Sequence, residues 1–240
     1  MSPPDSQGAA GLAPLIASGR SLRETTTGLP SALSEDEQAA HYDRRAAMYD
    51  RLIGSTLYNR IIWGASPRDY AAFAAEALAS DDGPVLEVGC GTAVFTHSVY
   101  GDAAREVVLV DRSLAMLERA RPRLEGTGAT LLQAELLDLP FTPGHFGTVC
   151  CFAVLHVLDD PWTALSAIRE QLAPDGRLFC SMLVRDRGGI SRPYMAGLRR
   201  RGELGEPRTE AELATAAREL FGSSAEVERT GSMAWLRAKR

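Results

Sequence analysis

The sequence predicts an α/β protein with a doubly wound, mostly parallel sheet, helices on both faces, an antiparallel last strand and an N-terminal helical lid. Two observations lead to this fold class. From residue 84 on, short apolar runs alternate with helical patterns, as in strands joined by crossover helices. The chain then ends on two strand-like runs joined through Gly231, which is typical of an antiparallel hairpin. A length of 240 residues, of which 45% are hydrophobic, suits one domain with additional material.

The N-terminal third divides into two parts. Residues 1–36 are rich in Ser, Thr, Pro, Gly and Ala, so we expect a disordered or loosely attached arm. Residues 37–80 have apolar side chains at helical spacing, and we expect a helical lid in which Tyr42, Tyr49 and Trp63 close over a ligand. The alternative is that these aromatics belong to the core. Ser66 and Pro67 begin the last helix of this segment as a cap and a first-turn proline.

The remaining elements follow in order over residues 81–240. Expected strands cover residues 84–90, 106–111, 129–135, 146–155 and 176–184, with the closing hairpin in 224–240. Expected helices begin near Ala93, at Ser113, at Pro161 and at Thr209. Between the fifth strand and the last helix, residues 183–209 mix Tyr194, Met195 and Leu198 with arginines. Residues 199–201 suit a solvated helix face, and an anion-binding run is the alternative.

Composition disfavours several classes of protein. A net charge of −5 gives no global positive field, so we expect no nucleic acid partner. No apolar run approaches the length of a membrane span, and the N-terminus does not resemble a signal peptide, so we expect a cytoplasmic protein. The cysteines show no zinc-type spacing, which predicts buried free thiols and no metal site: Cys90, Cys150, Cys151 and Cys180.

The end of the first strand has the pattern of a nucleotide-binding turn. Gly89 and Gly91 let the backbone turn tightly and approach a ligand. Val94 stands where a dinucleotide fingerprint has its third glycine, which disfavours a pyrophosphate. Glu87, two residues before the first glycine, can face an ammonium group or orient the turn. A tight structural turn without a ligand is the alternative.

Acids follow the next two strands. Asp111 ends the second strand, 20 residues past Gly91, where a carboxylate accepts hydrogen bonds from ribose hydroxyls. This position suits NAD and other adenosine ligands equally, and a helix-capping aspartate is the alternative. Glu135 follows the third strand, where it could accept from the amine of adenine. Phe152 and His156 stand at the mouth of the fourth strand. The pattern predicts a nucleoside site without selecting the nucleoside.

Five segments resemble, in order and spacing, the motifs of class I S-adenosylmethionine-dependent methyltransferases: "VLEVGCGTAVFT", "VVLVDRSLAML", "AELLDLPF", "FGTVCCFAVLHVLDDP" and "IREQLAPDGRLFCSM". They are most similar to the small-molecule branch that includes ubiquinone and menaquinone biosynthesis methyltransferases. The resemblance covers roughly residues 42–182, and the closing hairpin suits the family's reversed last strand. It implies a Rossmann-like fold and S-adenosylmethionine as the cofactor.

The resemblance also implies roles for single residues. The methionine and ribose part of the cofactor would lie along Gly89, Cys90 and Gly91, with Glu87 near its amino group. Asp111 would hold the ribose hydroxyls, and the adenine would lie beside Arg112, Met116, Glu135 and the N–H of Leu136. Phe152 stands where the family often has Asn or Ser, which removes a polar contact, and Tyr42 and Tyr49 would cover the site.

The expected reaction is methyl transfer to a small-molecule acceptor, at oxygen or carbon, by an in-line displacement that depends on positioning. His156 is the candidate general base, and a packing histidine is the alternative. Residues 183–209 would line the acceptor pocket. Two other classes stay open: a non-methylating S-adenosylmethionine binder, and an NAD(P)-dependent oxidoreductase, which Val94 and the closing hairpin disfavour. The sequence is also compatible with a homodimer.

Overall fold

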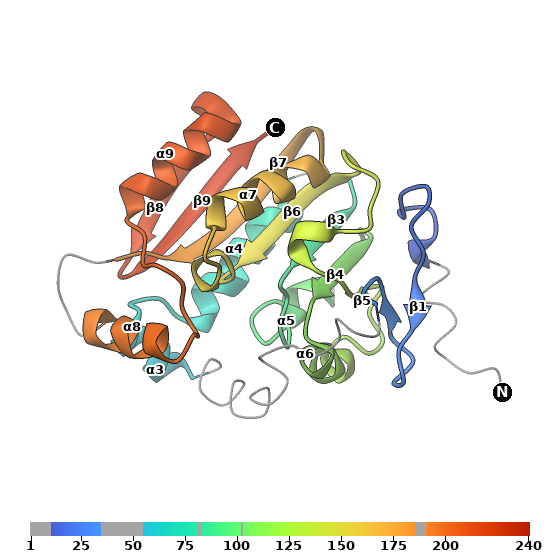
Figure 1. The fold of residues 1–240 in the computed structure, drawn as a ribbon, viewed down its shortest axis with the longest axis horizontal. Helices are drawn as coiled ribbons and strands as arrows, with labels where there is room; N and C mark the ends of the chain where they lie inside the picture. Colours follow the sequence, from blue (N-terminus) through green and yellow to red (C-terminus); the bar gives the residue numbers. More distant parts are fainter. Residues whose placement is uncertain (1–10, 35–54, 81–82, 102, 186–190) are drawn as a thin grey trace.

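The computed structural model describes residues 11–34, 55–80, 83–101, 103–185 and 191–240 (Figure 1). Within them, one nine-stranded sheet has the order β1-β2-β5-β4-β3-β6-β7-β9-β8. The expected mixed sheet with helices on both faces is therefore confirmed.

Five parallel strands form the middle of the sheet. They are β3 (Val85–Val88), β4 (Val107–Asp111), β5 (Thr130–Gln133), β6 (Phe146–Phe152) and β7 (Leu172–Leu183). Strand β3 pairs with β4 on one side and with β6 on the other. The chain therefore winds outward in both directions from β3, and the crevice beside this switch point is where open α/β sheets bind ligands.

The closing hairpin is reversed, as predicted. Strand β9 (Met233–Lys239) runs antiparallel to both β7 and β8 (Glu226–Thr230). Gly231 in the turn has a φ of 61°, and a Cβ there would lie 2.3 Å from the carbonyl oxygen of Trp63. Ser232 donates its N–H to the same oxygen at 2.8 Å. The hairpin is thus fixed to the end of the helix that precedes Trp63.

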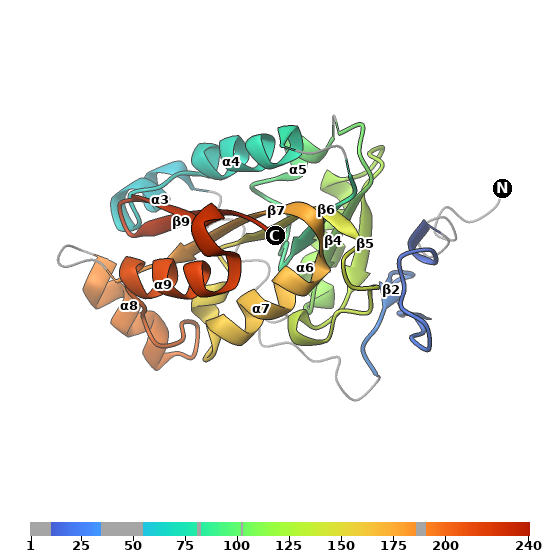
Figure 2. The ribbon, with the colours of Figure 1, turned by 90° about the horizontal axis from the view of Figure 1, so that it is seen from above.

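The helices cover both faces of the sheet (Figure 2). They are α3 (Thr56–Ile62), α4 (Pro67–Ala79), α5 (His97–Tyr100), α6 (Leu114–Ala120), α7 (Pro161–Gln171), α8 (Ser191–Arg200) and α9 (Glu210–Phe221). Buried side chains of α7 and α9 belong to one core, and those of α4 and α6 belong to the other. No described helix has the length and apolar character needed to cross a membrane.

Local chemistry explains where several helices begin. Ser66 and Asp69 form a capping box at α4, with Pro67 in the first turn, and Ser113 Oγ accepts from the Met116 N–H at α6. Ala93, where a helix was expected to begin, has a φ of 52°, so that helix starts only at His97. A helix face was expected at residues 199–201, but the start of α8 at Ser191 was not predicted.

The first described segment differs from the expected loose arm. Residues 11–34 contain β1 (Arg23–Glu24) and β2 (Pro30–Ser31), and β2 pairs with β5 at the edge of the parallel sheet. Leu12 and Leu15 are only 0% and 2% exposed, within the same core as α7. The segment has few large apolar side chains, but four of its leucines are buried, and that burial offsets the ordering of the backbone: Leu12, Leu15, Leu29 and Leu33.

The expected lid is described only in part. Helices α3 and α4 lie in it, whereas Tyr42 and Tyr49 fall outside the described residues. Trp63 is 5% exposed, at the end of α3. It contacts Tyr194 of α8 edge-on, with ring centroids 5.4 Å apart. This contact joins the end of α3, which precedes the parallel strands in the sequence, to α8, which follows them.

Candidate active site

A cavity of about 880 Å³ lies at the carboxyl ends of the parallel strands. Residues that follow β3, β4, β5 and β6 form one wall, and α3 and α8 form the other. Nine of the predicted site residues line it: Gly89, Gly91, Asp111, Arg112, Met116, Glu135, Leu136, Phe152 and His156. The cavity expected beside the topological switch point is therefore also the one lined by the residues of the sequence motifs.

The turn after β3 requires both of its glycines. Gly89 and Gly91 have φ values of 71° and 55°, in the left-handed region that strains other residues. A Cβ on Gly89 would lie 2.3 Å from a methyl of Val154, whereas one on Gly91 would meet nothing within 4 Å. The backbone at Gly91 consequently faces open space on the cavity wall, where a ligand can approach it closely.

Asp111 connects this turn to α6. One carboxylate oxygen accepts from the Gly91 N–H at 2.7 Å, and the other accepts from the Ser113 N–H at 2.8 Å. Ser113 itself caps α6, so Asp111 is not the helix cap. The arrangement places a carboxylate at the cavity wall beside the open backbone of Gly91.

Glu135, which follows β5, also lines this wall and forms an ion pair with Arg112. The other oxygen of Glu135 accepts from the Leu136 N–H at 3.0 Å. That N–H was expected to face an adenine ring, and here it is already bonded within the chain. Met116 and Leu136 add apolar contact area beside the charged pair.

Among the described residues, two that were predicted to bind the cofactor are not on the cavity wall. Glu87 is 2% exposed and accepts a hydrogen bond from the Thr96 hydroxyl at 3.0 Å. Burial raises the pKa of Glu87 to about 7. Cys90 is also buried, which raises the pKa of its thiol. Neither residue is part of the cavity lining, and the hydrogen bond of Glu87 is made to Thr96, which follows the glycine turn.

The side chain of His156 accepts a hydrogen bond from the backbone. Its Nδ1 accepts from the backbone N–H of Leu183 at 3.2 Å. Because that N–H can only donate, Nδ1 carries no hydrogen, and the hydrogen of the neutral ring is on Nε2. Burial lowers the pKa of His156 to about 3, so the ring is neutral at pH 7. The one free lone pair of the imidazole is already used, which argues against a general base here.

The wall opposite the glycine turn is aromatic and apolar. Tyr58 donates its hydroxyl hydrogen to the hydroxyl of Tyr194 at 2.6 Å, and Leu198 lies one turn along α8. Met195, in contrast, is 3% exposed and packs in the core. Residues 183–209 thus supply part of the wall, as expected. Sequence reasoning did not identify Tyr58 or Met233, because nothing in their local pattern distinguishes cavity lining from core.

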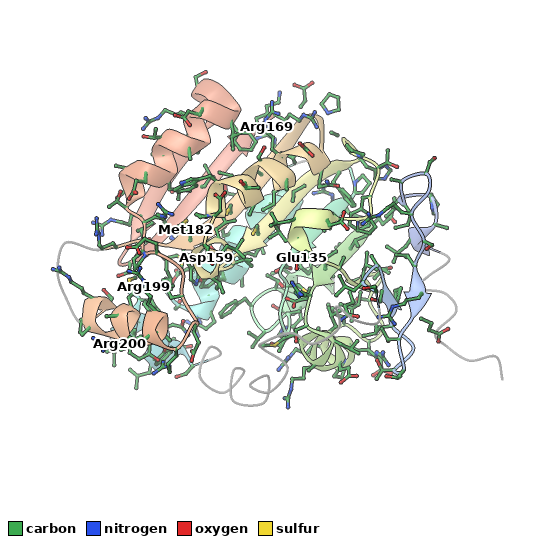
Figure 3. All side chains as sticks on the ribbon, viewed as in Figure 1. Glu135, Asp159, Arg169, Met182, Arg199 and Arg200 are labelled. Carbon is green, nitrogen blue, oxygen red and sulfur yellow. The ribbon has the colours of Figure 1, made fainter. Side chains whose placement is uncertain are left out.

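Arg199 and Arg200 at the end of α8 are exposed, as expected for a solvated helix face. Figure 3 labels Arg199 and Arg200 on α8 and Glu135 beyond β5. Arg199 pairs with Glu206. Arg201 donates to Glu203 at 2.9 Å, and both of these side chains also line the cavity. Among the described residues, no group of three His, Cys, Asp or Glu could hold a metal ion.

Comparison with known proteins agrees with this geometry. A family model described as a methyltransferase domain matches residues 86–180. The chain is 36% identical over 105 residues to the uncharacterized methyltransferase YodH of Bacillus subtilis, a match covering 43% of this chain and 44% of YodH. It is 30% identical over 158 residues to the ubiquinone/menaquinone biosynthesis C-methyltransferase UbiE of Ectopseudomonas mendocina, a match covering 62% of this chain and 59% of UbiE.

Solved structures share the fold. The 4+2 cyclase SpnF superposes with a TM-score of 0.64 and 17% identity, over 93% of this chain and 99% of that one. The curated relatives named above are matched over only 44% and 59% of their length. The fold is therefore the Rossmann-like one of these structures, and within it residues 86–180 match a methyltransferase domain. The particular branch that the chain resembles is that of the class I S-adenosylmethionine-dependent methyltransferases of ubiquinone and menaquinone biosynthesis.

Proposed function

We propose that this protein transfers a methyl group from S-adenosylmethionine to a small-molecule acceptor, at oxygen or carbon. One observation supports this best: a single cavity has two chemically different walls. The glycine turn and Asp111 form a nucleoside-type wall, and α3 and α8 form an aromatic wall. Such a cavity suits two ligands held side by side, as a bimolecular transfer requires.

The residues present fit the cofactor. The open backbone at Gly91 would lie against its ribose and methionine part, and Asp111 would accept from the ribose hydroxyls. Met116 and Leu136 would contact the adenine, with Glu135 near its amine. When bound, S-adenosylmethionine supplies a methyl group activated by a positive sulfur. The chain would orient the acceptor against that methyl and exclude water from it.

Positioning would carry most of the catalysis. His156 is neutral and its Nδ1 is engaged, so it does not supply a base. The acceptor would then be an atom that is nucleophilic at neutral pH, held in line with the methyl group. The four cysteines are free and buried, which supports a reducing compartment and a cytoplasmic protein. The net charge of −5 supports a small molecule over nucleic acid as the acceptor.

A non-methylating protein of the same fold is the second candidate. It is favoured by the full-length likeness to SpnF, which is a cyclase, and by the lack of an available base at His156. Such a protein would bind S-adenosylmethionine and leave it intact.

Two measurements test the proposal. In isothermal titration, S-adenosylmethionine and S-adenosylhomocysteine should bind, and NAD(H) and NADP(H) should not. Incubation with S-adenosylmethionine and a panel of phenols, amines and enolisable ketones should release S-adenosylhomocysteine above the rate without acceptor. Binding with no release for any acceptor would favour the second candidate, and preferential NAD(P) binding would contradict both.

A further inference from the structure

The N-terminal segment, residues 11–34, is bonded to the short turn that follows Glu135. That turn is a single 3-10 turn, η3 (Leu136–Asp138), and both Glu135 and Leu136 line the cavity. Arg20 donates to the carbonyl oxygen of Asp138 at 3.1 Å and to its carboxylate at 2.7 Å. The turn that presents Glu135 to the cavity is therefore held at its other end by Arg20.

Backbone pairing with the same segment continues beyond this turn. The N–H of Ala17 donates to the carbonyl oxygen of Pro140 at 2.9 Å, and the N–H of Thr142 donates to that of Leu15 at 2.9 Å. Leu15 is only 2% exposed, so the paired backbone is anchored in the core. Figures 1 and 2 show the segment at the β5 end of the parallel strands.

Gln133 lies between the N-terminal segment and the nucleoside-type wall. In the sheet it is opposite Asp111 on one side and Ser31 of β2 on the other, and its side chain is fully buried. Its Nε2 donates to the carbonyl oxygen of Arg112 at 3.0 Å. Without β2, β5 would be an edge strand of the described sheet, and water could compete for this bond. The N-terminal strand thus protects a bond that fixes the backbone next to Asp111.

Two chains of contacts meet at the carboxylate of Glu135. Gln133 fixes the backbone of Arg112, and the side chain of Arg112 forms the ion pair with Glu135. From the other side, Arg20 fixes the turn on which Glu135 stands. Neither Arg20 nor Gln133 is part of the cavity lining.

We propose that Arg20 and Gln133 are positioning residues that make the site selective for the amine of the purine. They act through η3 and through Arg112, and they hold the Glu135 carboxylate where it accepts from that amine. This inference rests on the proposed function and assigns residues 11–34 to the support of the cofactor site. The two residues set the affinity for the nucleoside and take no part in the transfer itself.

The test compares two ligands that differ only at the amine. One is S-adenosylhomocysteine, and the other is its 6-deamino analogue, which has hydrogen in place of the amine. Each is titrated calorimetrically into the full-length protein. We expect wild type to bind S-adenosylhomocysteine at least about tenfold more tightly, because the analogue leaves a charged acceptor without its hydrogen bond.

Two variants assign this preference to the positioning residues. Arg20→Ala removes a side chain that is 36% exposed, and Gln133→Met removes the donor with a side chain of similar length. The Oε1 of Gln133 has no hydrogen-bond partner within the described part of the chain, so the donor is the one bond lost. Each variant should lower the preference to about threefold or less, and bind the deamino analogue within about twofold of wild type.

Two further variants separate positioning from stability. Arg20→Lys keeps a charged donor for Asp138 and should retain a preference above about fivefold. Arg229→Ala is the matched control, because Arg229 is 38% exposed and forms an ion pair with Glu210 at 3.0 Å, on β8 at the other end of the sheet. It should leave both affinities unchanged. A general loss of stability would weaken both ligands equally and leave their ratio as in wild type.

The outcomes distinguish this inference from the proposed function. If wild type binds neither ligand, the proposed function fails. If it binds S-adenosylhomocysteine no better than the deamino analogue, the inference is overturned and the function stands. An undiminished preference in Arg20→Ala or in Gln133→Met overturns the role of that residue, and so does an equal loss of affinity for both ligands.

Discussion

Asp111 accepts the Gly91 N–H at 2.7 Å, and this bond links the end of β4 to the glycine turn after β3. Asp111→Ala should weaken S-adenosylmethionine binding by about 2 kcal/mol or more, because it removes both the anchor of the turn and a charge-assisted acceptor for hydroxyls. Asp111→Asn keeps an acceptor for the N–H without the charge and should lose less. Calorimetry with folded variants measures both, and an affinity within twofold of wild type for Asp111→Ala would refute the assignment.

The turn itself can be tested with a matched pair of glycines. Gly89 and Gly126 have φ values of 71° and 80°, but only at Gly89 would a Cβ clash, at 2.3 Å from Val154. Gly126→Ala should cost about 1–2 kcal/mol of unfolding free energy, from backbone strain alone. Gly89→Ala should cost more than that and also abolish cofactor binding. Equal losses of stability in urea denaturation would show that the contact with Val154 is easily relieved.

Residues 11–34 should contribute to the unfolding free energy of the protein. Leu12→Ala removes a fully buried side chain from the core and should lower the unfolding free energy by about 3 kcal/mol. Leu57→Ala, at a position that is 71% exposed, should change it by less than about 0.5 kcal/mol. Chemical denaturation of both variants provides the comparison. A loose arm would instead make Leu12→Ala as neutral as Leu57→Ala.

His156 should make the protein sensitive to acid. Its pKa in the unfolded chain is near the ordinary value of 6.5, whereas burial lowers it to about 3 in the folded protein. The unfolded state therefore binds this proton first as the pH falls, and stability declines from pH 6.5 toward pH 3. His156→Asn should flatten this part of the profile, as measured by unfolding free energies at several pH values. An unchanged slope would mean that other groups dominate it.

Glu87 should act in the opposite direction. Burial raises its pKa from 4.5 to about 7, so the folded protein keeps this proton longer than the unfolded chain. The stabilisation is complete below pH 4.5 and is lost as the pH rises through about 7. Glu87→Gln resembles the protonated acid and can still accept from Thr96, so it should be roughly 2 to 3 kcal/mol more stable than wild type above pH 7. A variant that is less stable than wild type at pH 8 would contradict the raised pKa of Glu87.

Local patterns were sufficient to predict the parallel strands and most helix starts. The runs at β3, β4 and β6 are mostly apolar and are buried on both faces. Ser66, Ser113 and Thr209 are polar caps at the beginning of helices. The end of β6 was set too late, because Ala153 has a φ of 58° and its N–H turns to Ser181. No sequence pattern indicates that an alanine will adopt a left-handed backbone conformation, so the end of β6 at Phe152 was not predictable.

The sequence predicted the residues of the site that follow strands, but it did not predict features that depend on long-range packing. Residues that follow consecutive strands, such as Gly91 and Asp111, have positions fixed by the topology, and they do lie together. Whether a side chain is buried depends on the packing around it, so the burial of Glu87 was not predicted from the sequence. The pairing of Tyr58 with Tyr194 joins residues 136 positions apart, and the state of His156 depends on a backbone N–H 27 positions away. Neither relationship has a local signal.

The two edge strands of the sheet determine whether two copies of the protein can pair edge to edge. At one edge, β1 pairs with β2 through only two residues, and at the other, β8 has charged, exposed Glu226, Glu228 and Arg229. Arg229 and Glu228 are held in ion pairs with Glu210 and Arg237. A short edge and a charged edge both oppose the addition of a foreign strand, which is how natural sheets avoid aggregating edge to edge. The short N-terminal strands and the charged β8 thus end the described sheet in forms that disfavour edge-to-edge pairing of two copies.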